Sequence, residues 1–209
     1  AIGHVRYSTT GENKAENLQP LFANLALGGF ACAHNGNLTN TSSLKKKLVE
    51  TGSIFQTTSD TEIILQLVAR SKKTKLLDKL IDALFQIQGA YSLIILTNKK
   101  LIGVRDPYGI RPLVLGDLNG SPVLASETCA LDIIGAKYVR DVENGEIIII
   151  TKSGIESIKP FPKLKERPCI FERIYFARPD SIVGGKTVYT YRKNLGEQLA
   201  TENKIKADV

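Results

Sequence analysis

The stretch AYSLIILTNKKLIGVR (residues 90–105) decides the fold class of this chain. Its two apolar halves predict two β-strands, and the polar Asn98-Lys99-Lys100 between them predicts the turn of a hairpin. Asn119-Gly120 and Ser153-Gly154 are further turn signals, each flanked by short apolar runs. Strands that follow one another through short turns favour an antiparallel sheet.

Outward from this hairpin, the other predicted strands and the helices occupy separate parts of the chain. Strands are predicted at 28–34, 111–116, 122–126, 147–151 and 155–158, and the first of these is expected to end in a turn at Asn35-Gly36-Asn37. Helices are predicted at 41–50, from Ser59 onward, at 74–88 and at 187–203. The helix that begins at Ser59 carries the capping-box pattern Ser59-Asp60-Thr61-Glu62. Helices that are gathered together, rather than alternating with strands, indicate an α+β fold.

The composition excludes several classes of protein. Of the 209 residues, 43% are hydrophobic and 23% are charged, which excludes a disordered chain. No apolar run approaches the roughly 18 residues that a membrane span needs, so we expect no membrane partner. The net charge is +7, but the lysines are dispersed and few aromatic residues lie among them, so we expect no nucleic-acid partner. The 3 cysteines form no CxxC pair, which favours a reducing, cytoplasmic location.

The texture of the chain changes near its prolines at 160, 162 and 168. We therefore expect one domain at 1–165 and the start of a second, truncated domain at 166–209. Ala1–Arg6 has the pattern of a strand that begins before the first residue, and 205–209 has the pattern of a strand that continues past the last. We therefore interpret the chain as an internal fragment.

Three features have side chains suited to binding a small polar molecule. Asn35 and Gly36 offer an amide donor and an unshielded backbone N–H, the pair that an oxyanion needs, although this motif taken alone favours an ordinary Asn-Gly turn. Arg6 precedes a hydroxyl-rich loop, where a guanidinium either clamps a carboxylate or pairs with a nearby acid. Asp60 is either a helix-start acid or the partner of an ammonium group. Together, Arg6 and Asp60 would recognise a free amino acid.

Several short segments, taken in order, resemble the class II (N-terminal-nucleophile) glutamine amidotransferases. They are GHVRYST (3–9), HNGNL (34–38), SDTE (59–62), DPYGIRPL (106–113) and SETCA (126–130). Two more, GAY (89–91) and YFARPDS (175–181), make the chain similar to the amidophosphoribosyltransferases within that family. The resemblance covers nearly the whole chain.

This resemblance implies a four-layer αββα sandwich of two antiparallel sheets, followed by the start of an α/β phosphoribosyltransferase domain. It also implies that an N-terminal cysteine attacks the glutamine carboxamide and releases ammonia, which displaces pyrophosphate from phosphoribosylpyrophosphate to give 5-phosphoribosylamine in purine biosynthesis. By the same resemblance, Arg6 and Thr9 bind the glutamine α-carboxylate, Asp60 binds its α-ammonium, and Asn35 and Gly36 form the oxyanion hole.

Two parts of that machinery are absent from the sequence. The nucleophilic cysteine would lie before Ala1, and the phosphoribosylpyrophosphate loop, which would use Mg²⁺, would lie after Val209. We therefore expect these 209 residues alone to bind glutamine poorly and to hydrolyse none. Cys169 is either a structural cysteine or one ligand of a 4Fe-4S cluster. A full-length protein of this family is expected to be a homo-oligomer.

Cys32 and His34 lie two apart on one strand face, but they are spaced too far along the strand for an easy Cys-His dyad, so we interpret Cys32 as a buried packing residue. Arg105 and Arg111 flank a turn and are expected to pair with acids. Arg178, Asp180 and Ser181 are predicted to lie at a domain interface. Two alternatives remain: the glutaminase domain of another class II amidotransferase, or a glutaminase-like module without catalysis.

Overall fold

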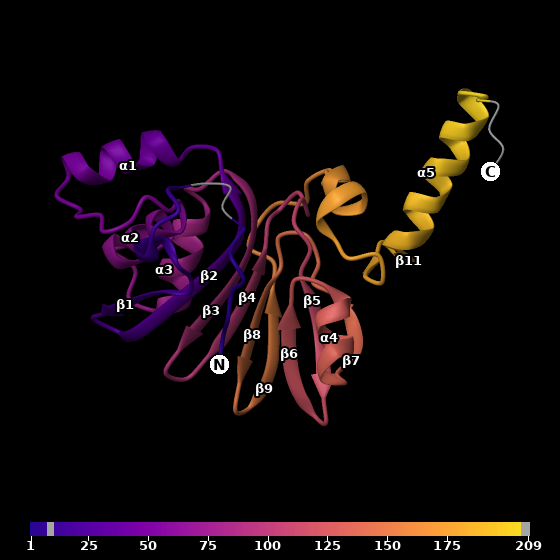
Figure 1. The fold of residues 1–209 in the computed structure, drawn as a ribbon. Coiled ribbons are helices and arrows are strands. Elements are labelled where there is room, and N and C mark those ends of the chain that lie inside the picture. The colour runs from indigo at the N-terminus through magenta and orange to yellow at the C-terminus, as the bar shows by residue number, and fades with distance from the viewer. Residues whose placement is uncertain (8–10, 206–209) are drawn as a thin grey trace.

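A computed structural model describes residues 1–7 and 11–205 and arranges them in four layers, in the order helices, sheet, sheet, helix (Figure 1). The larger sheet is antiparallel throughout, with the strand order β1-β2-β3-β4-β8-β9. Its strands are β1 (Leu21–Leu25), β2 (Gly28–Leu38), β3 (Gly89–Thr97), β4 (Leu101–Arg105), β8 (Ile147–Thr151) and β9 (Gly154–Ile158). The smaller sheet has the order β6 (Ser121–Ala125), β5 (Val114–Leu118) and β7 (Lys137–Asp141).

The helices cover the outer faces of these two sheets. The larger sheet carries α1 (Thr41–Glu50), α2 (Thr61–Arg70) and α3 (Leu76–Leu84), and the smaller sheet carries α4 (Thr128–Ile134). A 3-10 turn at Ala15–Asn17 precedes β1. Between β9 and the last helix lie a π-helical turn at Glu172–Phe176 and a small hairpin of β10 (Ile182–Val183) and β11 (Lys186–Thr187). The last helix, α5 (Val188–Glu202), extends away from the sandwich.

The run of isoleucines in β8 shows why the sequence builds two cores around one sheet. Side chains alternate between the faces of a strand. Ile147 and Ile149 therefore pack into the core beneath α1–α3, whereas Ile148 packs into the core between the two sheets. A third core joins Val114 of β5 to Leu131 of α4. Three apolar layers between four layers of secondary structure confirm the predicted αββα sandwich.

Two isoleucines on neighbouring strands provide a matched test of this layering. Ile149 is 1% exposed and Ile155 of β9 is 46% exposed. We expect Ile149→Ala to lower the free energy of unfolding by about 2–4 kcal/mol, because it leaves a cavity in the core. Ile155→Ala should change it by less than about 0.5 kcal/mol. Urea titration of both variants measures this, and equal losses would contradict the assignment of the two faces.

The structure confirms the predicted strands 90–97 and 101–105 and the predicted helix 41–50, but it corrects other expectations. The predicted strand at 1–6 is wrong, because residues 1–7 belong to no strand of either sheet. The predicted strand at 111–116 begins later, at Val114. The short elements β1, β7 and α4 were not predicted. In α5 Val188 is buried, but Leu195 and Leu199, which were expected to face inward, are 51% and 61% exposed.

The predicted turn at Asn35-Gly36-Asn37 is also wrong. Strand β2 continues through it to Leu38, because each of these residues still has a partner in β3, with Asn35 opposite Ser92 and Leu38 opposite Gly89. Pairing with a long neighbouring strand therefore overrides the local turn preference of Asn-Gly. The strand predicted to begin within 205–209 lies almost wholly outside the described residues.

Candidate active site

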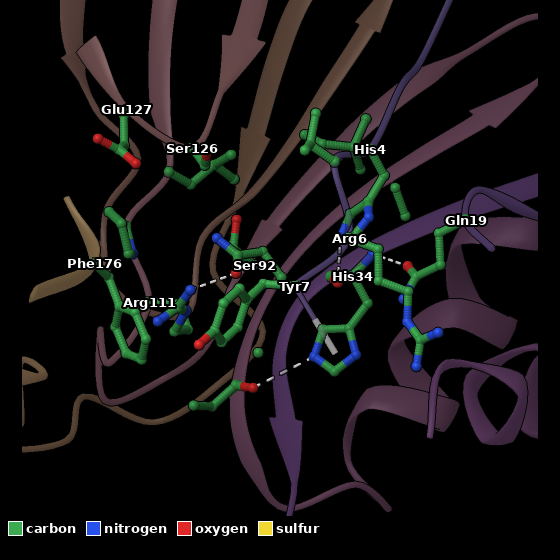
Figure 2. Close-up of a pocket in the computed structure, with 18 of the residues that line it drawn as sticks. His4, Arg6, Tyr7, Gln19, His34, Ser92, Arg111, Ser126, Glu127 and Phe176 are labelled. Carbon is green, nitrogen blue, oxygen red and sulfur yellow. Dashed lines mark hydrogen bonds between the residues drawn. The ribbon is translucent and has the colours of Figure 1, made fainter. Parts of the chain in front are cut away.

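A cavity of about 1200 Å³ opens at the ends of β2 and β3 and gathers most of the predicted site residues. Arg6, Asn35, Gly36, Asp60 and Cys169 all line it, although they are far apart in the sequence. Figure 2 shows His34 between Arg6 on one side and Arg111 on the other. Thr9, the remaining predicted residue, lies outside the described residues.

Asn35 faces the cavity from β2, and its carboxamide has a defined orientation. Its Oδ1 accepts a hydrogen bond from Nη2 of Arg111 (Figure 2). A guanidinium has donors only, so the carboxamide oxygen, rather than the nitrogen, must face it. The N–H donors of Nδ2 are then directed away from Arg111. Gly36, the next residue along β2, lines the same cavity.

Asp60 is buried, with 3% of the residue exposed, and its carboxylate is held by groups of the larger sheet. Its Oδ2 accepts the backbone N–H of Leu38 at 2.9 Å, and its Oδ1 lies 3.5 Å from Nδ1 of His34. Burial alone would raise the pKa of Asp60, but the bonds from His34, Leu38 and Thr61 together hold this pKa below its ordinary value. The site therefore contains a buried carboxylate that is ionised at neutral pH.

The predicted capping box at the start of α2 forms only in part. Ser59 Oγ accepts the backbone N–H of Thr61 at 3.3 Å, whereas the Asp60 carboxylate accepts the N–H of Leu38 in the sheet. The Glu62 carboxylate accepts the backbone N–H groups of Gln56 and Thr57 instead. Glu62 therefore fastens the loop that precedes α2, and Asp60 fastens the end of β2.

Arg6 lies on the opposite side of the cavity from Arg111 (Figure 2). Its Nη1 donates to the backbone oxygen of Glu12 at 3.2 Å. Asn17, which is fully buried, donates to the same oxygen at 2.6 Å and accepts the N–H of Thr58 at 2.9 Å. The segment after Arg6 is thus tied to the loop that leads into α2, next to Asp60.

His34 also lines the cavity, although no site role was predicted for it beyond its spacing from Cys32 and its place in the segment HNGNL. Its Nδ1 faces both Asp60 and the hydroxyl of Thr61, and its backbone N–H donates to Oε1 of Gln19 at 2.7 Å (Figure 2). Nε2 of His4 lies 3.1 Å from the backbone oxygen of His34, and burial lowers the pKa of His4. The alternation of side chains along β2 could have identified His34, because it turns Cys32 and His34 toward the face of the sheet that α2 covers. Asp60 lies directly before α2.

Cys32 is the buried packing residue that was predicted. It is fully buried in the core beneath α1–α3, and burial raises the pKa of its thiol to about 12. A thiol with this pKa is not a nucleophile at neutral pH. Cys129 is likewise 5% exposed, in α4.

The predicted pairing of arginines with acids is confirmed for Arg111 and wrong for Arg105. Nη1 of Arg111 lies 2.5 Å from Oε1 of Glu172, which is almost fully buried, and the guanidinium lies 5.1 Å from the centre of the Phe176 ring. Burial raises the pKa of Glu172, while Arg111 opposes this change. Arg105 donates only to backbone oxygens, including that of Val142, and so binds loops together.

The described residues supply little for a metal site. Within 1–7 and 11–205, no three side chains of His, Cys, Asp or Glu gather in a way that could hold a metal ion. Cys169 is an unpaired, partly exposed cysteine at the cavity edge, and its N–H donates to the backbone oxygen of Ile110. One thiolate is a quarter of the ligand set that a 4Fe-4S cluster needs, so the described residues do not build such a site by themselves.

Comparison with known proteins gives this geometry a family. Residues 4–132, which include Arg6, Asn35, Gly36 and Asp60, match the family model described as "Glutamine amidotransferase domain". The chain belongs to this glutamine amidotransferase domain family. The chain is 56% identical, over all of its length and 43% of the relative, to the amidophosphoribosyltransferase of Rhizobium etli. It is 51% identical, over all of this chain and 37% of the relative, to amidophosphoribosyltransferase 1, chloroplastic, of Arabidopsis thaliana.

Among solved structures, the chain is similar to the glutamine phosphoribosylpyrophosphate amidotransferase of B. subtilis, solved with ADP and GMP. The two superpose with a TM-score of 0.93 at 45% identity, over 98% of this chain and 44% of the other. The predicted resemblance to amidophosphoribosyltransferases is thus confirmed. The chain spans less than half the length of the relatives it matches. In the part of the chain that the structure describes, no helix has the length and apolar character needed to span a membrane.

Proposed function

We propose that this chain forms the glutamine site of an amidophosphoribosyltransferase, whose full-length protein hydrolyses glutamine and transfers the ammonia to phosphoribosylpyrophosphate. The observation that carries this proposal is the shared cavity of Arg6, Asn35, Gly36 and Asp60. A cation, an ionised carboxylate and an amide donor around one cavity are complementary to the carboxylate, ammonium and carboxamide of a free amino acid amide. The high identity to named amidophosphoribosyltransferases supports the same assignment.

Each residue has a defined task in this proposal. Arg6 donates to the α-carboxylate of glutamine, with Thr9 beside it, and Asp60 accepts from the α-ammonium. The carboxamide carbon is attacked by a nucleophile outside these 209 residues, and its oxygen gains negative charge. The Nδ2 of Asn35 and the N–H of Gly36 stabilise that charge, since donors fixed in advance where charge develops lower the barrier.

The rest of the reaction belongs to the full-length protein. We propose that ammonia displaces pyrophosphate from phosphoribosylpyrophosphate in the second domain, whose beginning is 166–209, and that Mg²⁺ serves that half. An iron–sulfur cluster requires ligands from outside these residues to join Cys169. A cytoplasmic location and a homo-oligomer stay predictions.

An Arg6→Met variant of the full-length protein tests the carboxylate contact. Removing the charged donors should raise KM for glutamine about 10–100-fold, with kcat changed by less than about threefold, because the contact is the same in ground and transition states. The matched control is Arg70→Met at the end of α2, whose guanidinium bonds Thr51 and Ser53 away from the cavity.

A second substrate makes this test specific. Glutamine with its α-carboxylate converted to an amide lacks the group that Arg6 binds. For the wild type, KM for this amide should exceed KM for glutamine by a similar factor. In Arg6→Met, KM for the amide should rise little further. If Arg6→Met weakens both substrates equally, Arg6 does not contact the carboxylate.

A further inference from the structure

We propose that Arg111 is a positioning residue for glutamine hydrolysis, which fixes the Asn35 carboxamide with its N–H donors toward the oxyanion, and that Glu172 holds Arg111 in place. This inference rests on the proposed function of Asn35. It assigns a task to Arg111, which was predicted only to pair with an acid, and to Glu172, which no sequence pattern singled out. Neither residue is proposed to touch the substrate.

The need for a positioning residue comes from the near symmetry of a carboxamide. A half-turn about the last side-chain bond exchanges the oxygen of Asn35 with its NH₂ group at almost no steric cost. In the wrong orientation, the carboxamide presents a partial negative charge to the developing oxyanion and destabilises it. The bond from Nη2 of Arg111 to Oδ1 of Asn35 selects the right orientation, because the guanidinium cannot accept a hydrogen bond from NH₂.

Arg111 can impose this orientation because it is itself held from several directions. Its backbone N–H donates to Oδ2 of Asp106 at 3.1 Å, and the Asp106 carboxylate is fully buried. Its Nη1 contacts Glu172, whose side chain is 5% exposed, and Phe176 lies against the guanidinium (Figure 2). Because both side chains are largely buried, this ion pair is screened less by water than one at the surface.

The two ends of this chain of contacts lie in different parts of the sequence. Asn35 and Arg111 are within the matched family segment 4–132, whereas Glu172 lies beyond it, in the π-helical turn Glu172–Phe176. The alignment of the oxyanion donor therefore depends on the segment that leads toward α5. A glutaminase segment that ended at 132 would keep Asn35 and Arg111 but lose the carboxylate that holds the arginine.

The test is a double-mutant cycle on glutamine hydrolysis by the full-length protein. Asn35→Ala should lower kcat about 100–1000-fold, as loss of an oxyanion donor does. Arg111→Met should lower kcat about 10–100-fold, with KM for glutamine changed by less than about threefold. The double variant should be no slower than Asn35→Ala by more than about twofold, because Arg111 acts through Asn35.

Further variants separate positioning from folding. Glu172→Gln should lower kcat about 3–10-fold in a wild-type background and not at all beside Asn35→Ala. Arg70→Met controls for the loss of an arginine, and thermal melting of each variant reports folding. Should Arg111→Met fail to fold, the Glu172→Gln cycle decides alone. Additive losses, or wild-type kcat in Arg111→Met, overturn the inference while the proposed function stands; wild-type kcat in Asn35→Ala overturns the function of Asn35 itself.

Discussion

Replacing Gly36 by alanine is expected to abolish measurable glutamine hydrolysis by the full-length protein and to destabilise its fold. The φ of Gly36 is +154°, a conformation that favours glycine, and an added Cβ would lie 2.0 Å from the backbone oxygen of Ala90 and 2.8 Å from Nε2 of His34. Since the oxygen belongs to β3, one of the two paired strands must shift. A shift of β2 moves both proposed oxyanion donors, for which a loss of more than about 100-fold in kcat is expected.

Gly154 provides the matched control for this substitution. Its φ is +127°, but no atom lies within 4 Å of the position that a Cβ would take. Gly154→Ala therefore carries a similar backbone strain without the clash, and it should lose about 1–2 kcal/mol of stability while kcat stays unchanged. Activity assays and urea titrations of both variants measure the contrast. Wild-type kcat in Gly36→Ala would contradict the proposed position of the oxyanion hole.

The parts of the fold that local physics determines were predictable. The runs 90–97 and 101–105 became β3 and β4 because apolar residues on both sides of a turn have few alternatives to a hairpin, and 41–50 became α1. Asn35-Gly36 shows the opposite case. Its local preference is a turn, but continued pairing of β2 with β3 determines the outcome, and that pairing depends on residues far along the chain.

The candidate site likewise has residues that the sequence predicts and contacts that only the structure gives. Arg6, Asn35, Gly36 and Asp60 were named from residue type and from the family resemblance, and the structure places them around one cavity. The contact of Arg111 with Asn35 joins residues 76 positions apart, and no spacing rule brings them together. Thr9 stays a prediction. The network beneath the site required the arrangement of the sheets.

Asp60→Asn in the full-length protein is expected to raise KM for glutamine about 10–150-fold, because a neutral amide replaces the charged partner of the α-ammonium. Asparagine keeps an oxygen for the N–H of Leu38, so the fold should tolerate the change.

Because the pKa of Asp60 is lowered, its carboxylate is ionised at all pH values above its ordinary range. Its contribution to stability and binding should therefore be constant near neutrality and lost only as the pH falls through its lowered pKa.

Glutaramate, which has the carboxylate and carboxamide of glutamine but no α-ammonium, distinguishes a lost charge pair from a damaged site. The wild type and Asp60→Asn should have values of kcat/KM for glutaramate within about threefold of each other, since neither can form the missing pair. Asp78→Asn is the matched control, because Asp78 is likewise an acid near the start of a helix but lies at the exposed surface of α3. A variant that loses glutamine and glutaramate hydrolysis to the same degree would show that Asp60 supports the shape of the cavity through His34 and Leu38, and that the ammonium is bound elsewhere.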